Sequence, residues 1–478
     1  MASPLTIIIL AAGLGTRMKS RKAKVLHRAG GKALIEHVLD TASHLTESGS
    51  THVVTGHQAE EVEALVAPRG VHFVRQTEQK GTGHAVLCCQ RFLEQRSGRV
   101  IVLYGDVPLL REETLRRLLD LHEHSGAGVT AITTVLENPT GYGRIVRGES
   151  GEVAAVVEEK ASTAEQRRIR EINAGIYCFE AELLWRNLAL IQPANPAGEY
   201  YLTDMVEILH RAGHRISTLP IEDSTELLGI NTRVELAEVD RILRRRKVEQ
   251  LMLDGVTIER PETVTVDPQV IIGQDTVIEA FARITGRTVI GADCRVGAGT
   301  ILEDAHLEDE VQILPLTMIA SCYVERGARI GPYARLRMES RVEAEALIGN
   351  FVELKKTRLG GKSKAQHLSY LGDATLGEGV NVGAGTITCN FDGRKKHETR
   401  IGNQAFIGSH ATLVAPVEIG DGSYVGAGSV ITEAVPAEAL ALGRGRQVVK
   451  EGWARSRREA AATGRETEAG TPQPGGRR

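Results

Sequence analysis

A glycine-rich turn stands near the start of the chain, directly after a short apolar run. Residues 11–18 have the sequence AAGLGTRM and follow a strand predicted over residues 6–10. Backbone N–H groups in such a turn can approach phosphate oxygens closely. Arg17 and Lys24 add positive charge where a triphosphate would lie. The turn lacks the features of a Walker loop or a dinucleotide-binding motif, and an ordinary tight turn explains a lone GxG equally well.

A carboxylate follows a second apolar run. Residues 100–104 lead into Gly105-Asp106-Val107-Pro108. If the run is a strand of a parallel sheet, Asp106 lies at the carboxyl edge, where such sheets bind ligands. Mg²⁺ needs few carboxylates when substrate phosphates supply further oxygens, so one Asp is chemically adequate. Asp106 could instead cap the turn before the proline.

A histidine in the second half of the chain is a candidate proton acceptor. His367 lies three residues before Tyr370 and close to four lysines, at positions 355, 356, 362 and 364. A histidine that titrates near neutrality can remove the proton from an amine attacking a thioester. A surface histidine in a loop is the plainer alternative.

The elements that would position these residues differ between the two halves. Up to about residue 230, apolar strands alternate with helical stretches, which predicts a parallel, doubly wound α/β sheet. Strands are expected at 6–10, 51–55, 71–75, 100–104 and 128–134, and helices at 83–93 and 112–124.

Residues 232–253 contain helix formers and many opposite charges, without Gly or Pro. They predict an exposed helix connecting two domains. The run Arg244-Arg245-Arg246-Lys247 leaves an RNA-binding helix as an alternative, which the interleaved acids disfavour.

Beyond residue 253, aliphatic residues recur every six positions, which fits neither a helix nor an ordinary strand. One short strand and one corner per six residues predict a β-helix whose aliphatic side chains point into a triangular prism. The register breaks near residues 303–323 and 355–400 are expected to hold loops or insertions. The recurring positions are Ile272, Ile278, Ile284, Ile290, Val296 and Leu302; Val324, Ile330, Leu336, Val342, Ile348 and Leu354; and Ile401, Ile407, Leu413, Ile419, Val425 and Ile431.

Composition excludes several classes of protein. A net charge of −3 gives no signal for nucleic acid, and the apolar N-terminal run is too short to span a membrane. Six cysteines show neither metal-type spacing nor a disulfide framework, which favours free thiols in the cytoplasm. The polar, Pro/Gly-containing tail from about residue 454 is expected to be disordered.

Taken in order, the motifs resemble those of the sugar-phosphate nucleotidyltransferases. Together with the hexapeptide half, nearly the whole chain resembles the bifunctional N-acetylglucosamine-1-phosphate uridylyltransferase / glucosamine-1-phosphate acetyltransferase (GlmU) family. The motifs are LAAGLGTRM, Lys24, GTGHA at 81–85, YGDVPL at 104–109, GYGRI at 141–145 and EINAGIY at 171–177.

The resemblance implies domains at 1–231 (nucleotidyltransferase) and 254–447 (left-handed β-helix), joined by the helix at 232–253 and followed by an arm and tail at 448–478. It implies Mg²⁺, with UTP and acetyl-CoA as co-substrates, glucosamine-1-phosphate and N-acetylglucosamine-1-phosphate as sugar substrates, and a homotrimer with acetyltransferase sites between neighbouring β-helices. Nucleic acid and membrane insertion are not implied.

In the first domain the resemblance assigns Arg17 and Lys24 to phosphate stabilisation and Asp106 and Asn231 to Mg²⁺. The nucleotide and sugar contacts that it implies are Leu10, Ala11, Ala12, Gly13, Gln76, Gly81, Thr82, Tyr104, Gly143, Glu158, Asn173 and Asn231.

In the β-helix the resemblance makes His367 the general base. It assigns the sugar phosphate to Arg337, Lys355, Tyr370, Asn381 and Lys396, and the acetyl-CoA groove to Asn390, Ser409, Ala427 and Arg444.

Two positions depart from the family pattern. Ala23 stands where the family usually has proline before the lysine, and Phe391 stands where it usually has tyrosine. Two other functions remain open: a monofunctional nucleotidyltransferase with a structural or regulatory β-helix, and a non-catalytic interaction protein.

Overall fold

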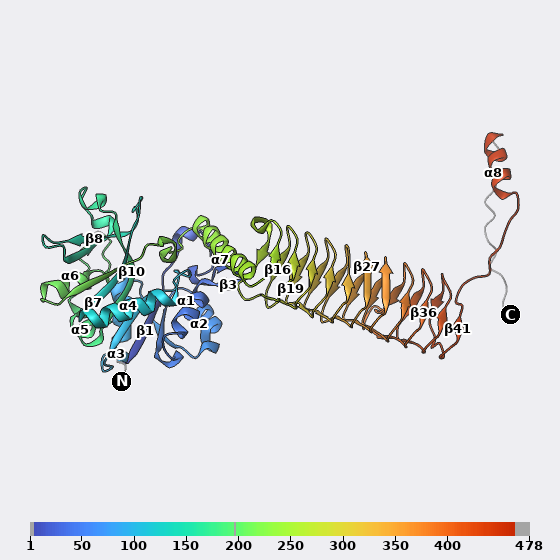
Figure 1. The fold of residues 1–478 in the computed structure, drawn as a ribbon, viewed down its shortest axis with the longest axis horizontal. Helices are drawn as coiled ribbons and strands as arrows, with labels where there is room; N and C mark the ends of the chain where they lie inside the picture. Colours follow the sequence, from blue (N-terminus) through green and yellow to red (C-terminus); the bar gives the residue numbers. More distant parts are fainter. Residues whose placement is uncertain (1–3, 196, 464–478) are drawn as a thin grey trace. The chain divides into compact units, whose positions relative to one another are not determined.

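The structure is a computed structural model, and it describes residues 4–195 and 197–463. The chain divides into two compact units, one ending at Ala305 and the other beginning at His306. Figure 1 shows an α/β fold followed by a long stack of short strands. No helix within the described residues is long and apolar enough to cross a membrane.

The first unit is built on a mixed sheet with the strand order β11-β7-β10-β6-β1-β4-β5, extended by β8 and β9 (Figure 1). A separate small hairpin pairs β2 with β3. The strands are β1 (Leu5–Ala11), β2 (Arg28–Ala29), β3 (Lys32–Ala33), β4 (Thr51–Thr55), β5 (His72–Arg75), β6 (Arg99–Tyr104), β7 (Val129–Val135), β8 (Gly143–Arg147), β9 (Val153–Val157), β10 (Glu171–Glu180) and β11 (Ile216–Pro220).

Helices cover both faces of this sheet because alternate residues of its central strands point to opposite sides. Ile7 and Ile9 of β1 pack with α1, α2 and α4, whereas Ile8 packs with α3, α5 and α6. The doubly wound arrangement predicted from the sequence is therefore confirmed. The helices are α1 (Leu34–Ser43), α2 (Ala59–Val66), α3 (Thr82–Leu93), α4 (Glu112–Ser125), α5 (Ala181–Asn187) and α6 (Asp204–Arg211).

The sheet departs from the parallel sheet that the alternating pattern predicts, because β10 and the β8–β9 hairpin form antiparallel pairs. β10 runs antiparallel to both of its neighbours, β6 and β7. The chain between β7 and β10 contains the β8–β9 hairpin and short turns, with no α-helix to carry a crossover. Because a parallel connection needs such a crossover, the chain returns in the opposite direction.

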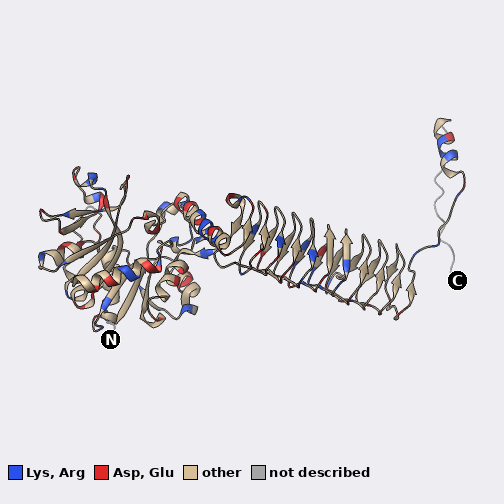
Figure 2. Ribbon diagram, viewed as in Figure 1, with Lys and Arg blue, Asp and Glu red and all other residues tan. Residues whose placement is uncertain are grey.

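Helix α7 (Arg233–Leu253) begins at a capping box formed by Thr232 and Glu235. It is less exposed than expected, since Val239 is buried in a small apolar cluster with Met18, Leu34 and other residues of the first unit. Figure 2 shows positive and negative residues interleaved along it.

The basic run of α7 is neutralised within the protein. Arg244 pairs with Asp240 and Asp267, Arg245 pairs with Glu249, and Arg246 lies 3.9 Å from Asp223. These arginines therefore hold the helix in place, which disfavours RNA binding.

After α7 the chain forms a left-handed β-helix whose strands fall into three groups; within each unit, successive members of a group pair in parallel. The first group is β12 (Thr257–Ile258), β15 (Val277–Ile278), β18 (Arg295–Val296), β21 (Gln312–Ile313), β24 (Arg329–Ile330), β27 (Leu347–Asn350), β30 (Lys364–His367), β33 (Asn381–Val382), β36 (Phe406–Ile407), β39 (Tyr424–Val425) and β41 (Leu440–Ala441). The second group is β13 (Thr265–Val266), β16 (Arg283–Thr285), β19 (Ile301–Glu303), β22 (Met318–Ala320), β25 (Arg335–Arg337), β28 (Glu353–Lys355), β31 (Tyr370–Gly372), β34 (Ile387–Cys389), β37 (Thr412–Val414) and β40 (Val430–Ile431). The third is β14 (Ile271–Ile272), β17 (Val289–Ile290), β20 (His306–Leu307), β23 (Tyr323–Val324), β26 (Arg341–Val342), β29 (Arg358–Leu359), β32 (Ala374–Leu376), β35 (Thr399–Ile401) and β38 (Val417–Ile419).

The expectation of loops or insertions at residues 303–323 is wrong. Leu307, Ile313 and Ile319 are buried strand residues that continue the pattern. The spacing shortens from six to five residues between Leu302 and Leu307 and again between Ile319 and Val324. Within the second unit, a corner one residue shorter shifts the register without interrupting the coil.

Most of the second break, residues 355–400, also continues the β-helix. Leu359, Ala365 and Leu371 are fully buried in successive strands. The one long excursion in this region of the described chain is the loop between β34 and β35, at residues 390–398.

Part of the tail is helical. α8 (Trp453–Ala462) occupies residues expected to be disordered, and its alanines, arginines and glutamate are good helix formers. The expectation for residues 464–478 lies outside the described residues.

We predict that Ile313→Ala lowers the free energy of unfolding by about 2–5 kcal/mol, because it empties a buried site in the column. Chemical denaturation measures this. Gln312→Ala, on the exposed face of the same strand, is the matched control and should change stability by less than about 0.5 kcal/mol. Equal effects of the two substitutions would contradict the continuous column.

Candidate functional site

Lys24 is the centre of the site in the first unit. Its Nζ forms an ion pair with Asp106 Oδ2 and donates a hydrogen bond of 3.2 Å to Asn231 Oδ1. Arg17 Nη2 donates to the same Asn231 oxygen at 2.8 Å. The four side chains named for phosphate and Mg²⁺ from the sequence thus form one contact network.

The fold brings these residues together from distant segments. Asp106 follows β6, and its backbone carbonyl accepts from the Ile230 amide at 3.0 Å. Asn231 lies just before α7, and its backbone N–H donates to Glu235, the capping-box carboxylate, at 2.7 Å. The hydrogen bond between Ile230 and Asp106 therefore holds the start of α7 against the carboxyl edge of the sheet.

A second group of predicted residues lies at the start of α3. The Gln76 amide donates to the Gly81 carbonyl at 3.1 Å. Gly81 has a φ of 102°, and a Cβ there would come within 2.6 Å of the Tyr200 carbonyl oxygen, so only glycine fits. Burial raises the pKa of Tyr104, whose hydroxyl interacts with Thr82, so this hydroxyl stays protonated.

The predicted sugar contacts converge around Gly143. It pairs in register with Asn173, and a Cβ on it would lie 3.7 Å from the Glu158 carboxyl carbon. Burial raises the pKa of Glu158, although the Thr203 hydroxyl donates to it at 3.3 Å and works in the opposite direction. Asn173 donates to Tyr177 Oη at 2.6 Å, which fixes its amide.

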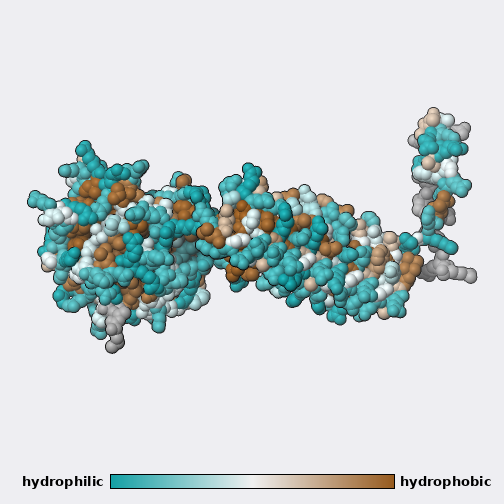
Figure 3. Space-filling view, viewed as in Figure 1, coloured by the Kyte–Doolittle hydropathy of each residue, from teal (hydrophilic) through white to brown (hydrophobic). Residues whose placement is uncertain are grey.

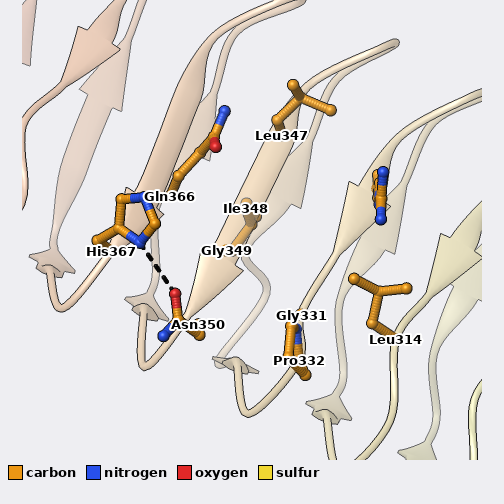
Figure 4. A pocket seen from close by; sticks show the side chains of 10 residues that line it. Leu314, Gly331, Pro332, Leu347, Ile348, Gly349, Asn350, Gln366 and His367 are labelled. Carbon is orange, nitrogen blue, oxygen red and sulfur yellow. Dashed lines mark hydrogen bonds between the residues drawn. The ribbon is translucent and has the colours of Figure 1, made fainter.

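In the second unit, His367 is exposed at the end of β30 and lines a pocket of about 310 Å³ (Figure 4). Its Nδ1 lies 3.0 Å from the side-chain oxygen of Asn350, its register partner on β27. An amide oxygen only accepts hydrogen bonds, so Nδ1 carries the proton and the Nε2 lone pair of the neutral ring is available to accept one.

A buried ion pair organises a second pocket. Lys355 Nζ donates to both carboxylate oxygens of Asp373 at 2.7 Å, and their side chains are only 3% and 11% exposed. Asn390 also donates to Asp373. Burial alone would lower the pKa of Lys355, but the Asp373 carboxylate outweighs it and raises that pKa. Lys355 in turn lowers the pKa of exposed Lys396, which lies in the 390–398 loop.

The remaining predicted substrate residues lie on more than one sheet. Arg337, Lys355 and Gly372 are in register on the second group of strands, where Glu353 pairs with Tyr370 and accepts from Arg337 at 2.7 Å. Asn381, by contrast, belongs to the same strand group as His367. No residue of the described chain is shared between the His367 pocket and the Lys355 pocket.

The predicted acetyl-CoA residues beyond Asn390 lie on successive coils. The Ser409 carbonyl accepts from the Gly428 amide at 2.8 Å, and Arg444 donates to the Ala427 carbonyl at 2.8 Å. These contacts place Ser409 beside Gly428 and Ala427 beside Arg444.

Sequence analysis missed Asn350 and Asp373. A signal for both was present: Asn350 lies 17 residues before His367, and Asp373 lies 18 residues after Lys355. Three hexads make one coil, so each spacing places the missed side chain next to the predicted one.

Comparison with known proteins finds matches for both halves of the chain. Residues 7–172 match the model of the MobA-like NTP transferase domain, and residues 269–303 and 398–433 match the bacterial transferase hexapeptide repeat. Three relatives named "Bifunctional protein GlmU" match nearly end to end. The one from Solibacter usitatus is 58% identical, covering 97% of this chain and 99% of the relative. The Anaeromyxobacter sp. and Koribacter versatilis relatives are 51% and 49% identical, covering 99% and 95% of this chain and 97% of each relative.

The chain belongs to the GlmU family. It is accordingly a bifunctional enzyme with an acetyltransferase and a uridylyltransferase activity. GlmU membership disfavours both the monofunctional nucleotidyltransferase and the non-catalytic interaction protein.

We predict a pH-dependent contribution from Asp204, which lines a pocket beside Glu158 in this GlmU chain. Burial, assisted by Glu207, raises the pKa of Asp204 from 3.8 to about 6 in the folded protein. The folded state holds this proton more tightly than the unfolded state, so stability falls as pH rises from about 4 to about 6. Asp204→Asn should remove that fall. Thermal unfolding between about pH 4 and pH 7 measures it, and an unchanged pH profile would contradict the assignment.

We also predict that Asp373→Asn lowers the free energy of unfolding by about 3 kcal/mol, because it leaves the buried Lys355 ammonium without its counter-charge. Chemical denaturation is the measurement. The matched control is Glu378→Gln in the exposed pair with Lys362, which should change stability by less than about 1 kcal/mol. A comparable loss in the control would refute the special role of the buried pair.

Proposed function

We propose that the two activities act in sequence. The β-helix transfers the acetyl group of acetyl-CoA to glucosamine-1-phosphate, and the N-terminal domain transfers uridylyl from UTP to the resulting N-acetylglucosamine-1-phosphate, releasing pyrophosphate. The observation that carries this proposal is the presence of two complete sets of chemical groups in one chain: Lys24 with Asp106 and Asn231, and His367 with Asn350. The proposed boundaries are 1–231, 232–253, 254–447 and 448–478.

Uridylyl transfer requires alignment and charge neutralisation rather than a protein nucleophile. A phosphate oxygen of the sugar attacks the α-phosphorus of UTP in line, and pyrophosphate leaves. Arg17 and Lys24 stabilise the charge that develops on the phosphates. The turn at residues 10–13, with Gln76, Gly81 and Thr82, holds the nucleotide, while Gly143, Glu158 and Asn173 hold the sugar.

The residues present fit a Mg²⁺ ion. Asp106 and Asn231 both direct a side-chain oxygen at one cationic group, the Lys24 ammonium. Two hard oxygen ligands suit Mg²⁺, which takes its other ligands from water and substrate phosphates. Asp106 and Asn231 would hold the ion, whose charge would neutralise the phosphate oxygens.

Acetyl transfer requires a base for the amine of glucosamine-1-phosphate. His367 Nε2 accepts the amine proton as the nitrogen attacks the thioester carbonyl, and the CoA thiolate leaves and is protonated. Asn350 accepts from Nδ1 and thus keeps the base in the required tautomer.

The remaining side chains of the β-helix bind the two acetyl-transfer substrates. The sugar phosphate is bound by Arg337, Lys355, Tyr370, Asn381 and Lys396, and the Asp373 carboxylate holds the Lys355 ammonium in place. Lys396 is exposed, whereas Lys355 is buried. Lys396 can therefore reach the dianionic sugar phosphate without breaking the buried Lys355–Asp373 ion pair. Asn390, Ser409, Ala427 and Arg444 line the acetyl-CoA groove.

A homotrimer accounts for the distribution of these residues over two pockets. Leu316, Tyr333, Phe351 and Leu368 are each about half exposed, and all four have positive φ. Such a surface favours burial against a neighbouring subunit. Figure 3 shows apolar side chains exposed among hydrophilic ones along the β-helix. The structure records no disulfide among the six cysteines, which supports a cytoplasmic location.

We predict separable losses of activity. His367→Ala should lower acetyl transfer about 100-fold or more by removing the base, and Asp106→Ala should lower uridylyl transfer by a similar factor. Each variant should keep the other activity, measured with its own substrates on the full chain.

His306→Ala is the control for the histidine, because His306 stacks on Tyr323 and lines neither the His367 pocket nor the Lys355 pocket. If His367→Ala retains acetyl transfer, the assignment of the base is wrong. Retention of uridylyl transfer by Asp106→Ala would remove the Mg²⁺ assignment.

A further inference from the structure

The backbone immediately before Lys24 is held by one side chain. The Ala23 N–H donates a hydrogen bond to the side-chain oxygen of Gln58, which comes from the segment between β4 and α2. Ala23 is buried and starts the short helix Lys24–Leu26. This bond therefore fixes the point from which the Lys24 side chain leaves the backbone.

The backbone carbonyl of Gln58 accepts from the Val62 N–H at the start of α2, but the Gln58 side chain has no capping role in that helix. Its φ is 52°, a left-handed conformation that is unfavourable for glutamine. It occupies the N-cap position of α2, yet its side chain makes no capping hydrogen bond. Apart from the bond to Ala23, its side chain makes one long contact within the described chain, 3.4 Å to Glu61.

Alanine at position 23 makes this bond necessary. Ala23 has φ −53° and ψ 139°, which lie within the range that proline adopts. Proline, usual in the family at this position, would fix φ by its ring and would have no N–H. Alanine does not restrict φ in this way, and its backbone N–H is a buried donor that needs a hydrogen-bond acceptor. Gln58 supplies the acceptor and restrains the backbone.

We propose that Gln58 is a positioning residue for uridylyl transfer: it holds the Ala23–Lys24 backbone so that the Lys24 ammonium lies between Asp106 and Asn231. The inference rests on the proposed role of Lys24. Because Gln58 acts through Lys24, its loss lowers kcat more than it changes the KM for UTP.

The test is a double-mutant cycle on the full chain. Gln58→Ala should lower kcat of uridylyl transfer about tenfold, whereas Gln58→Glu, which keeps an acceptor oxygen, should retain activity to within about threefold. In an Ala23→Pro background, where no N–H remains, Gln58→Ala should change kcat by less than about twofold. Acetyl transfer by the same samples should be unchanged, and thermal unfolding of each variant verifies that the first unit is folded.

Glu61→Ala is the matched control, since it removes the other partner of Gln58 without touching the Ala23 bond. An equal loss from Gln58→Ala in the wild-type and Ala23→Pro backgrounds, or the same loss in Glu61→Ala, would overturn the inference. With Lys24→Ala measured beside these variants, a loss there but not in Gln58→Ala refutes the positioning role alone. If Lys24→Ala and Gln58→Ala both transfer uridylyl at the wild-type rate, the role of Lys24 on which the inference rests is refuted.

Discussion

A single ammonium group, that of Lys24, joins three segments of the first unit that are far apart in the chain. Asp106 and Asn231 reach it only because β1 and β6 lie side by side in parallel and end at the same edge of the sheet. The alternating apolar residues of β1 bury both faces of the sheet, and this burial sets the strand positions. The geometry of the site thus depends on the packing of the sheet beneath it. Asn231 is held at the site because its backbone N–H donates to Glu235 of the α7 capping box.

The β-helix uses a related arrangement with different geometry. Lys355 and Asn390 both donate to Asp373, so a carboxylate rather than an ammonium is the shared group. Coil stacking brings these residues together, because each position lies directly above the one a coil earlier. In both halves a lysine, an aspartate and an asparagine form the core of the site, and buried partners limit how the charged groups can move.

The alternation of strands and helices and the period of six residues predicted the two architectures. Most of the candidate site residues came instead from the resemblance to the GlmU family, and the structure brings several of them into contact. A strict period of six could not show that Leu307 and Ile319 continue the coil. Corners one residue shorter change the spacing of the buried aliphatic residues from six to five. The direction of β10 depends on how the chain returns after a hairpin, which local patterning does not reveal. Asp373 and Gln58 escaped notice because their roles depend on contacts between segments rather than on neighbouring residues.

The central claim is that one chain carries both activities and uses them in order. The most direct measurement is product analysis with glucosamine-1-phosphate, acetyl-CoA, UTP and Mg²⁺, together and with each component omitted in turn. The account predicts that UDP-N-acetylglucosamine forms only when all four are present, and that N-acetylglucosamine-1-phosphate accumulates when UTP is left out. Failure to acetylate glucosamine-1-phosphate, or failure to couple the acetylated sugar phosphate to UTP, would contradict it.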